Sequence, residues 1–120
     1  MRVEWSDEAW KLLDNILQEC ENRFGKKNVE KFLGRVKRCN QSLVDNPYMG
    51  KLEPLLEYLP LSLRTFVLHP YYKIVYYVNE FEDCIYVITL WDSRRNPEEY
   101  VKELFDEKKD YLVSKIDELL

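Results

Sequence analysis

The sequence predicts an α+β domain in which an N-terminal helical hairpin packs on a small antiparallel β-sheet and a C-terminal helix ends the chain. Two stretches near the N-terminus carry apolar residues at helical spacing. Residues 63–91 hold three apolar, β-branched and aromatic runs separated by short polar breaks. Helical spacing then returns after Pro97. At 120 residues, a single domain spanning residues 1–120 is expected.

The N-terminal part is expected to form a short strand and a first helix. Val3 and Trp5 alternate with charged neighbours over residues 2–5, which favours an edge strand. Ser6 is a suitable N-cap for the helix that follows, and Gly25 is well placed to end it. The predicted apolar stripe of this helix is Trp10, Leu13, Ile16, Leu17, Cys20 and Phe24.

A second helix is predicted to begin at an Asn28 cap and to stop at residues 45–47, Asp-Asn-Pro. Its predicted apolar stripe is Val29, Phe32, Leu33, Val36, Cys39 and Leu43. Because the connection between the two helices is short, they should form an antiparallel hairpin. Each helix has a single apolar face, so both need a surface to cover, and the sheet supplies it.

Three strands are predicted in meander order, at residues 63–68, 72–78 and 85–91. His69-Pro70 separates the first two, since proline cannot donate to a strand ladder. Residues 79–83 form a polar break of the length that joins hairpin strands. Alternation along the middle strand places one set of side chains on one face and the other set opposite. The two sets are Tyr72, Ile74, Tyr76 and Val78, and Lys73, Val75 and Tyr77.

The final helix is expected over residues 96–120, with Asn96 as its cap and Pro97 in its first turn. This segment is acidic, with eight carboxylate side chains against four lysines. We predict that it acts as a movable cover over the Arg94 end of the sheet. A helix that simply packs on the core is the alternative.

Composition excludes several classes of protein. The chain has 18 Lys+Arg against 22 Asp+Glu, a net charge of -4, which disfavours a uniformly basic nucleic-acid binder but leaves a local basic patch open. We expect no direct binding of duplex DNA. Scattered cysteines (Cys20, Cys39 and Cys84) favour neither a disulfide framework nor a zinc site, so the cytoplasm is the simplest location. No apolar run is long enough to cross a membrane, and no signal-peptide pattern is seen, so no membrane partner is expected.

The candidate site residues are cations and tyrosines around the sheet. His69 is the only histidine, which excludes two-histidine acid–base pairs and histidine-rich metal sites; we favour a structural role for it and expect no metal or cofactor. The candidates are Arg64, Lys73, Arg94, Arg95 and Tyr100. Arginine and lysine stabilise charge on a phosphate, and tyrosine stacks on a base or exchanges a proton. A solvated sheet face would explain the same residues.

The ordered set of features resembles the RelE/ParE superfamily of toxins from type II toxin–antitoxin modules. The resemblance rests on the helix hairpin, on Pro47, Met49 and Gly50, on the strand Tyr-Tyr-Lys-Ile-Val-Tyr, and on the ending Trp-Asp-Ser-Arg-Arg-Asn-Pro. It covers nearly the whole chain and implies the α+β fold predicted above. Two activities are known in this superfamily.

The RelE branch would imply ribosome-dependent cleavage of mRNA on the open side of the sheet. By position, the resemblance makes Lys73, Arg94 and Tyr100 catalytic, and Arg64 takes roughly the place of another basic residue. In that chemistry the 2′-hydroxyl attacks the adjacent phosphate, while cations stabilise the charge and a tyrosine or basic group moves the proton.

The ParE branch fits two features better, the Arg-Arg-Asn-Pro ending and the lack of a strongly basic composition. Members of that branch poison DNA gyrase and have no accepted nuclease activity. Here Arg64, Lys73, Arg94 and Arg95 would contact the target or a phosphate group. We therefore expect a ParE-like toxin; a RelE-like mRNA endonuclease and a degenerate member that only binds its antitoxin are the alternatives. A cognate antitoxin should bind an exposed apolar strip on the hairpin side and the sheet edge.

Overall fold

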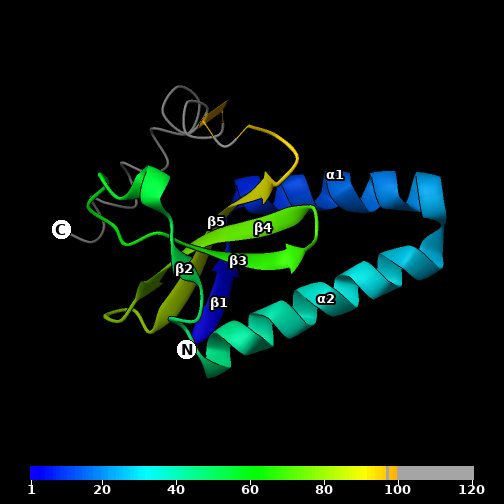
Figure 1. Ribbon diagram of the computed structural model, residues 1–120. Helices are drawn as coiled ribbons and strands as arrows, with labels where there is room; N and C mark the ends of the chain where they lie inside the picture. Colours follow the sequence, from blue (N-terminus) through cyan, green and yellow to red (C-terminus); the bar gives the residue numbers. More distant parts are fainter. Residues whose placement is uncertain (97, 100–120) are drawn as a thin grey trace.

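The structure is a computed structural model that describes residues 1–96, 98 and 99. Its elements are β1 (Arg2–Trp5), α1 (Asp7–Phe24), α2 (Lys26–Asp45), β2 (Lys51–Leu52), the 3₁₀ turn η1 (Pro54–Leu56), β3 (Arg64–His69), β4 (Tyr72–Asn79) and β5 (Cys84–Asp92). The α1–α2 hairpin lies against the sheet, and the junction of the two helices projects well beyond it (Figure 1). Apart from residues 98 and 99, which are helical, the helix predicted for the end of the chain lies outside the described residues.

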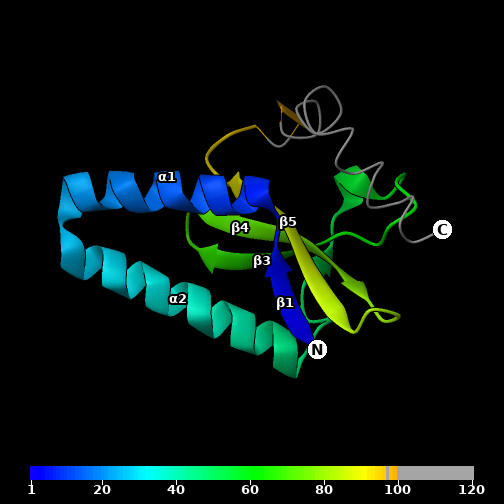
Figure 2. The same cartoon turned by 180° about the vertical axis from the view of Figure 1, so that it is seen from behind.

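The five strands form one mixed sheet in the order β1-β5-β4-β3-β2. Strands β3, β4 and β5 pair antiparallel in sequence order, which confirms the predicted meander. Strand β2, which was not predicted, pairs antiparallel with β3. The predicted edge strand β1 is also confirmed, but it pairs parallel with β5 (Figure 2). The antiparallel prediction does not extend to β1 because β1 joins the sheet through the helices, and a long connection permits a parallel neighbour.

The first helix begins and ends where the sequence predicted. Ser6 Oγ accepts a hydrogen bond from the Ala9 amide (3.0 Å) and donates one to the Ile88 carbonyl (2.6 Å), so the cap also ties α1 to β5. Gly25 ends the helix with φ +84°, a left-handed conformation that glycine adopts without strain.

The predicted start of the second helix at Asn28 is wrong, because α2 begins at Lys26. A single left-handed residue, Gly25, reverses the chain, so no further linker is needed. The Asn28 side chain serves the preceding helix instead. Its amide donates to the Phe24 carbonyl (2.8 Å), one of the carbonyls that the end of α1 leaves unpaired.

The stripe on α2 is largely as predicted, whereas the stripe on α1 is shifted at both ends. Buried residues of α2 are Phe32, Val36, Cys39 and Leu43. On α1 the buried residues are Ala9 and Leu13, while the predicted Trp10 and Phe24 are 53% and 66% exposed. Phe24 is exposed because it belongs to the end of the hairpin that projects past the sheet (Figure 1).

The sheet has a core on each face. Ile74 and Tyr76 pack with the helices, whereas Val75 and Tyr77 pack on the opposite face, as the alternation predicted. That opposite face is not open, because Leu56 and the residues that follow it in the chain cover part of it; the other residues of this cluster are Leu59, Leu61, Leu63, Cys84, Tyr86, Ile88 and Trp91. The sequence predicted no helix or strand for the segment around Leu56.

A β-bulge in β5 changes which side chains face the helices. Val75 pairs with Thr89 and Tyr76 pairs with Val87, so Ile88 is the extra residue. Beyond the bulge Trp91 lies on the face away from the helices and pairs with Lys73. The bulge therefore places the buried indole of Trp91 on the same face of the sheet as Lys73.

The loop at Pro47–Gly50 is clamped to the sheet by two side chains. The buried Tyr76 hydroxyl donates to the Pro47 carbonyl (2.9 Å) and accepts from the Gly50 amide (2.9 Å). Arg64 donates to the Gly50 carbonyl (2.8 Å) and to the Tyr48 carbonyl (3.2 Å). The close approach of Tyr76 explains the glycine at residue 50, because a Cβ there would lie 2.6 Å from the Tyr76 hydroxyl oxygen.

Replacing Gly34 with alanine should raise the free energy of unfolding by about 0.5–1 kcal/mol. Gly34 lies inside α2, and an added Cβ would meet only the flexible end of Arg38, at 3.3 Å from Nη1. Urea denaturation of the two proteins measures the change. A loss of stability would mean that this position has a packing role that its surroundings do not reveal.

Candidate functional site

Arg94 is the centre of a polar cluster where β5 ends and β4 begins. Its Nε and Nη2 atoms donate to the Asp92 carboxylate (3.0 and 2.9 Å), and Nη2 also donates to the Tyr72 hydroxyl (3.3 Å). The guanidinium lies over the Tyr71 ring, 4.5 Å from its centroid. The hydrogen bond from Arg94 holds the pKa of Asp92 below its usual value, and the same bond raises the pKa of Arg94. Arg94 is therefore oriented and largely charge-balanced.

His69 belongs to the same end of the sheet and is surrounded by rings. Its ring centroid lies 5.5 Å from that of Phe32, 5.3 Å from that of Tyr71 and 5.9 Å from that of Tyr72. Its Nδ1 accepts a hydrogen bond from the Tyr71 amide (3.2 Å). Burial lowers the pKa of His69, and nearby positive charge, including Arg35, lowers it further. These contacts fit the structural role expected for this histidine.

Beside this cluster the projecting helices enclose a groove of about 520 Å³, here called the hairpin groove. Four cations line it, Arg23, Lys31, Arg35 and Arg94, against one carboxylate, Glu19. Arg23 and Glu19 form an ion pair (3.0 Å). The other lining residues are Ile16, Cys20, Phe24, Asn28, Phe32, His69, Tyr71 and Tyr72. The groove is thus cationic at its rim and aromatic in its walls.

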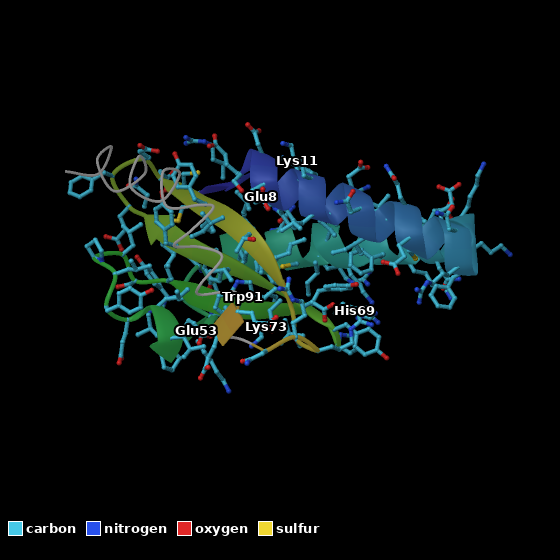
Figure 3. The ribbon with its side chains drawn as sticks, turned by 90° about the horizontal axis from the view of Figure 1, so that it is seen from above. Glu8, Lys11, Glu53, His69, Lys73 and Trp91 are labelled. Carbon is cyan, nitrogen blue, oxygen red and sulfur yellow. The ribbon has the colours of Figure 1, made fainter. Side chains whose placement is uncertain are left out.

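The structure separates the predicted site residues. Lys73 is half-buried on the face away from the helices, paired with Trp91 across the strands (Figure 3). Arg94 contacts Tyr72, whose ring packs against the hairpin core. Arg64 pairs with Tyr76, four positions along β4 from Tyr72, or about 13 Å.

The two remaining predicted residues lie near the end of the described chain. Arg95 donates to Glu99 Oε2 (3.3 Å), and the two form an i,i+4 ion pair. Tyr100 lies outside the described residues. Only Arg94 and Arg95 are therefore brought together by the described structure, and they are neighbours in sequence.

Sequence reasoning missed the partners of Arg94 and the cations of the second helix. Asp92 stands two residues before Arg94, a spacing that would have suggested the pair. Lys27, Lys31 and Arg35 are spaced four residues apart, which places them on one side of a helix. This spacing is visible in the sequence and would have predicted the cationic side of the second helix.

Comparison with known families decides the relationship. Residues 3–97, from β1 to the end of the Arg94 cluster, match the model of the family described as the ParE toxin of the type II toxin–antitoxin system parDE. The chain belongs to the ParE toxin family. None of the proteins of curated function that were compared matches this ParE-family chain.

Solved structures with the same fold include members of both branches. A chain of the chromosomal ParDE system from P. aeruginosa has a TM-score of 0.60 and 18% identity, covering 77% of this ParE-family chain and 95% of its own. A chain of the intact E. coli RelBE toxin–antitoxin complex has a TM-score of 0.50 and 18% identity, with coverages of 78% and 98%. The isolated E. coli RelE toxin has a TM-score of 0.50 and 18% identity, with coverages of 86% and 97%. At these identities the likeness establishes the shared fold.

The described part of this ParE-family chain contains no helix that is both long and apolar enough to cross a membrane. Within the same residues, no three His, Cys, Asp or Glu side chains come together as metal ligands would. Cys39 and Cys84 are buried and Cys20 is partly exposed, and burial raises the pKa of the Cys39 thiol to about 12.

Proposed function

We propose that this protein is the toxin of a type II toxin–antitoxin module that arrests growth by binding DNA gyrase. Its membership of the ParE toxin family supports the toxin role. We favour gyrase as the target because the cations that the nuclease alternative requires do not lie around one site in the described structure. A cognate antitoxin neutralises the toxin in this proposal.

Cleavage of RNA by the RelE-type chemistry needs cations and a proton-transfer group around one phosphate. Lys73 and Arg94 lie on opposite sides of the sheet, and Arg94 is already bound to the Asp92 carboxylate. Arg64 directs its guanidinium at the loop carbonyls of Tyr48 and Gly50. The described residues therefore supply no convergent phosphate site of that kind, which favours the ParE-like activity.

The purified protein is expected to inhibit supercoiling by gyrase or to trap cleaved DNA, and transcripts should remain intact in arrested cells. Supercoiling assays and primer extension on cellular mRNA measure the two effects. As a control, Tyr100→Phe, which removes the proton-transfer group of the nuclease alternative, should arrest growth as strongly as the natural sequence. Transcript breaks that disappear in this variant would establish the nuclease alternative. Absence of growth arrest would establish the degenerate alternative.

We further propose that the antitoxin adds a strand to the outer edge of β3. Strand β2 pairs only with Arg64 and Thr65, so residues 66–69 have no outer neighbour among the described strands. Val67 is 64% exposed on this edge. Exposed apolar side chains on the hairpin, namely Trp10, Phe24, Leu33 and Val44, supply further contact area of the expected kind.

A further inference from the structure

Four cations form a row along one side of α2, here called the α2 cation row. Lys27, Lys31 and Arg35 follow one another at four-residue intervals, and Arg38 comes three residues later. In a helix this spacing keeps the four side chains on one side over about 16 Å. All four are exposed, and in the described part of the chain none of them takes part in an ion pair.

The row surrounds a shallow recess of about 570 Å³. Gly34 forms part of its lining and has no side chain, so the recess approaches the helix backbone closely. Glu30 is the one carboxylate among the six lining residues. Since the whole chain has a net charge of -4, this density of positive charge is a local feature and does not follow from the composition.

The recess continues into the hairpin groove. Lys31 and Arg35 line both. One aromatic ring of the groove is largely exposed, Phe24 at 66%, whereas Arg94 covers one side of the Tyr71 ring. A line of positive charge therefore runs beside an exposed flat apolar surface.

We propose that the α2 cation row and the hairpin groove bind single-stranded nucleic acid, with phosphates along the row and a base stacked on Phe24. A cationic track next to stacking rings is the arrangement that binds single strands without base specificity. A duplex keeps its bases inside and would leave the Phe24 ring unused. The inference does not depend on gyrase or on any other target of the toxin.

A peptide that binds as an added strand fits this surface less well. Peptides that bind as extended segments gain affinity from backbone hydrogen bonds at a sheet edge. The backbone of α2 satisfies its own hydrogen bonds within the helix. The row thus offers charges and the Phe24 ring only, and the open strand edge is at β3.

Fluorescence anisotropy with labelled 12-mers of dT and of U tests the proposal on the full chain. The double variant Lys31→Glu, Arg35→Glu should weaken binding at least tenfold at 50 mM salt. Because each neutralised phosphate contributes about 0.7 to the salt slope of a single strand, the slope should fall by about 1.4. Phe24→Ala should weaken binding with the slope unchanged.

The matched control is Lys11→Glu, Lys37→Glu, which makes the same charge change at exposed positions off the row. Figure 3 shows Lys11 on α1. This control should bind within twofold of the natural sequence. Equal loss in both double variants, no binding to either oligonucleotide, or stronger competition by poly-glutamate than by unlabelled oligonucleotide would each overturn the proposal. Unequal affinity for dT and U would identify the preferred nucleic acid.

Discussion

Replacing Gly50 with alanine is expected to lower the free energy of unfolding by about 3 kcal/mol. An added Cβ would come within 2.6 Å of the Tyr76 hydroxyl and 2.7 Å of the Thr65 carbonyl oxygen. Real carbon atoms do not approach that closely, and Thr65 cannot yield because its oxygen is part of β3. The loop would have to leave Tyr76, which would then lose two buried hydrogen bonds.

Urea denaturation measures this loss, with Gly34→Ala as the matched control. The control makes the same chemical change at a glycine whose added Cβ meets only the flexible Arg38 side chain. The two substitutions should therefore change stability in opposite directions. A loss below 1 kcal/mol at Gly50 would mean that the loop can move aside without cost and that the clamp is not a fixed part of the fold.

Replacing Val67 with aspartate is expected to weaken antitoxin binding about 100-fold, or 2.7 kcal/mol, because it puts a charge into the proposed strand pairing. The toxin should still fold, since residue 67 is exposed and pairs with Lys73, which would face the new carboxylate. Calorimetry with the protein encoded by the neighbouring reading frame measures the affinity.

Phe81→Asp is the control for this change. Phe81 is a fully exposed apolar residue in the turn between β4 and β5, far along the strands from the open edge of β3. Its replacement should leave the affinity within twofold of the natural value. If both variants bind the antitoxin normally, the antitoxin does not use the β3 edge.

Periodicity predicted the parts of the fold that repeat. The helix stripes and the alternation on β4 depend on neighbouring residues only, so Phe32, Val36, Ile74 and Tyr76 were placed correctly. Asn28 was misplaced because one glycine, Gly25, completes the reversal between the helices. The correct placements and the error at Asn28 both depend only on residues that are close together in the sequence.

Features without a period could not be predicted in this way. The bulge at Ile88 interrupts the alternation, so counting along β5 fails to place Trp91. The cover over the second face comes from residues around Leu56, which have neither helical nor strand periodicity. For the site, the sequence identified Arg94 as a candidate functional cation. Its pairing with Asp92 and its position on the side of the helices follow from how the chain turns at the end of β5, which has no sequence period.

The parallel pairing of β1 with β5 has a consequence for synthesis of the protein. Ser6, at the junction of β1 and α1, and Ile88 in β5 are joined by a hydrogen bond and are 82 positions apart. A ribosome adding about 5–20 residues per second must therefore make most of the chain before β1 finds its neighbour. Until β5 has been synthesised, β4 lacks one of its two neighbouring strands, and the helical hairpin has no complete sheet to pack against. The nascent chain consequently spends several seconds on the ribosome with an incomplete sheet and an uncovered helical hairpin.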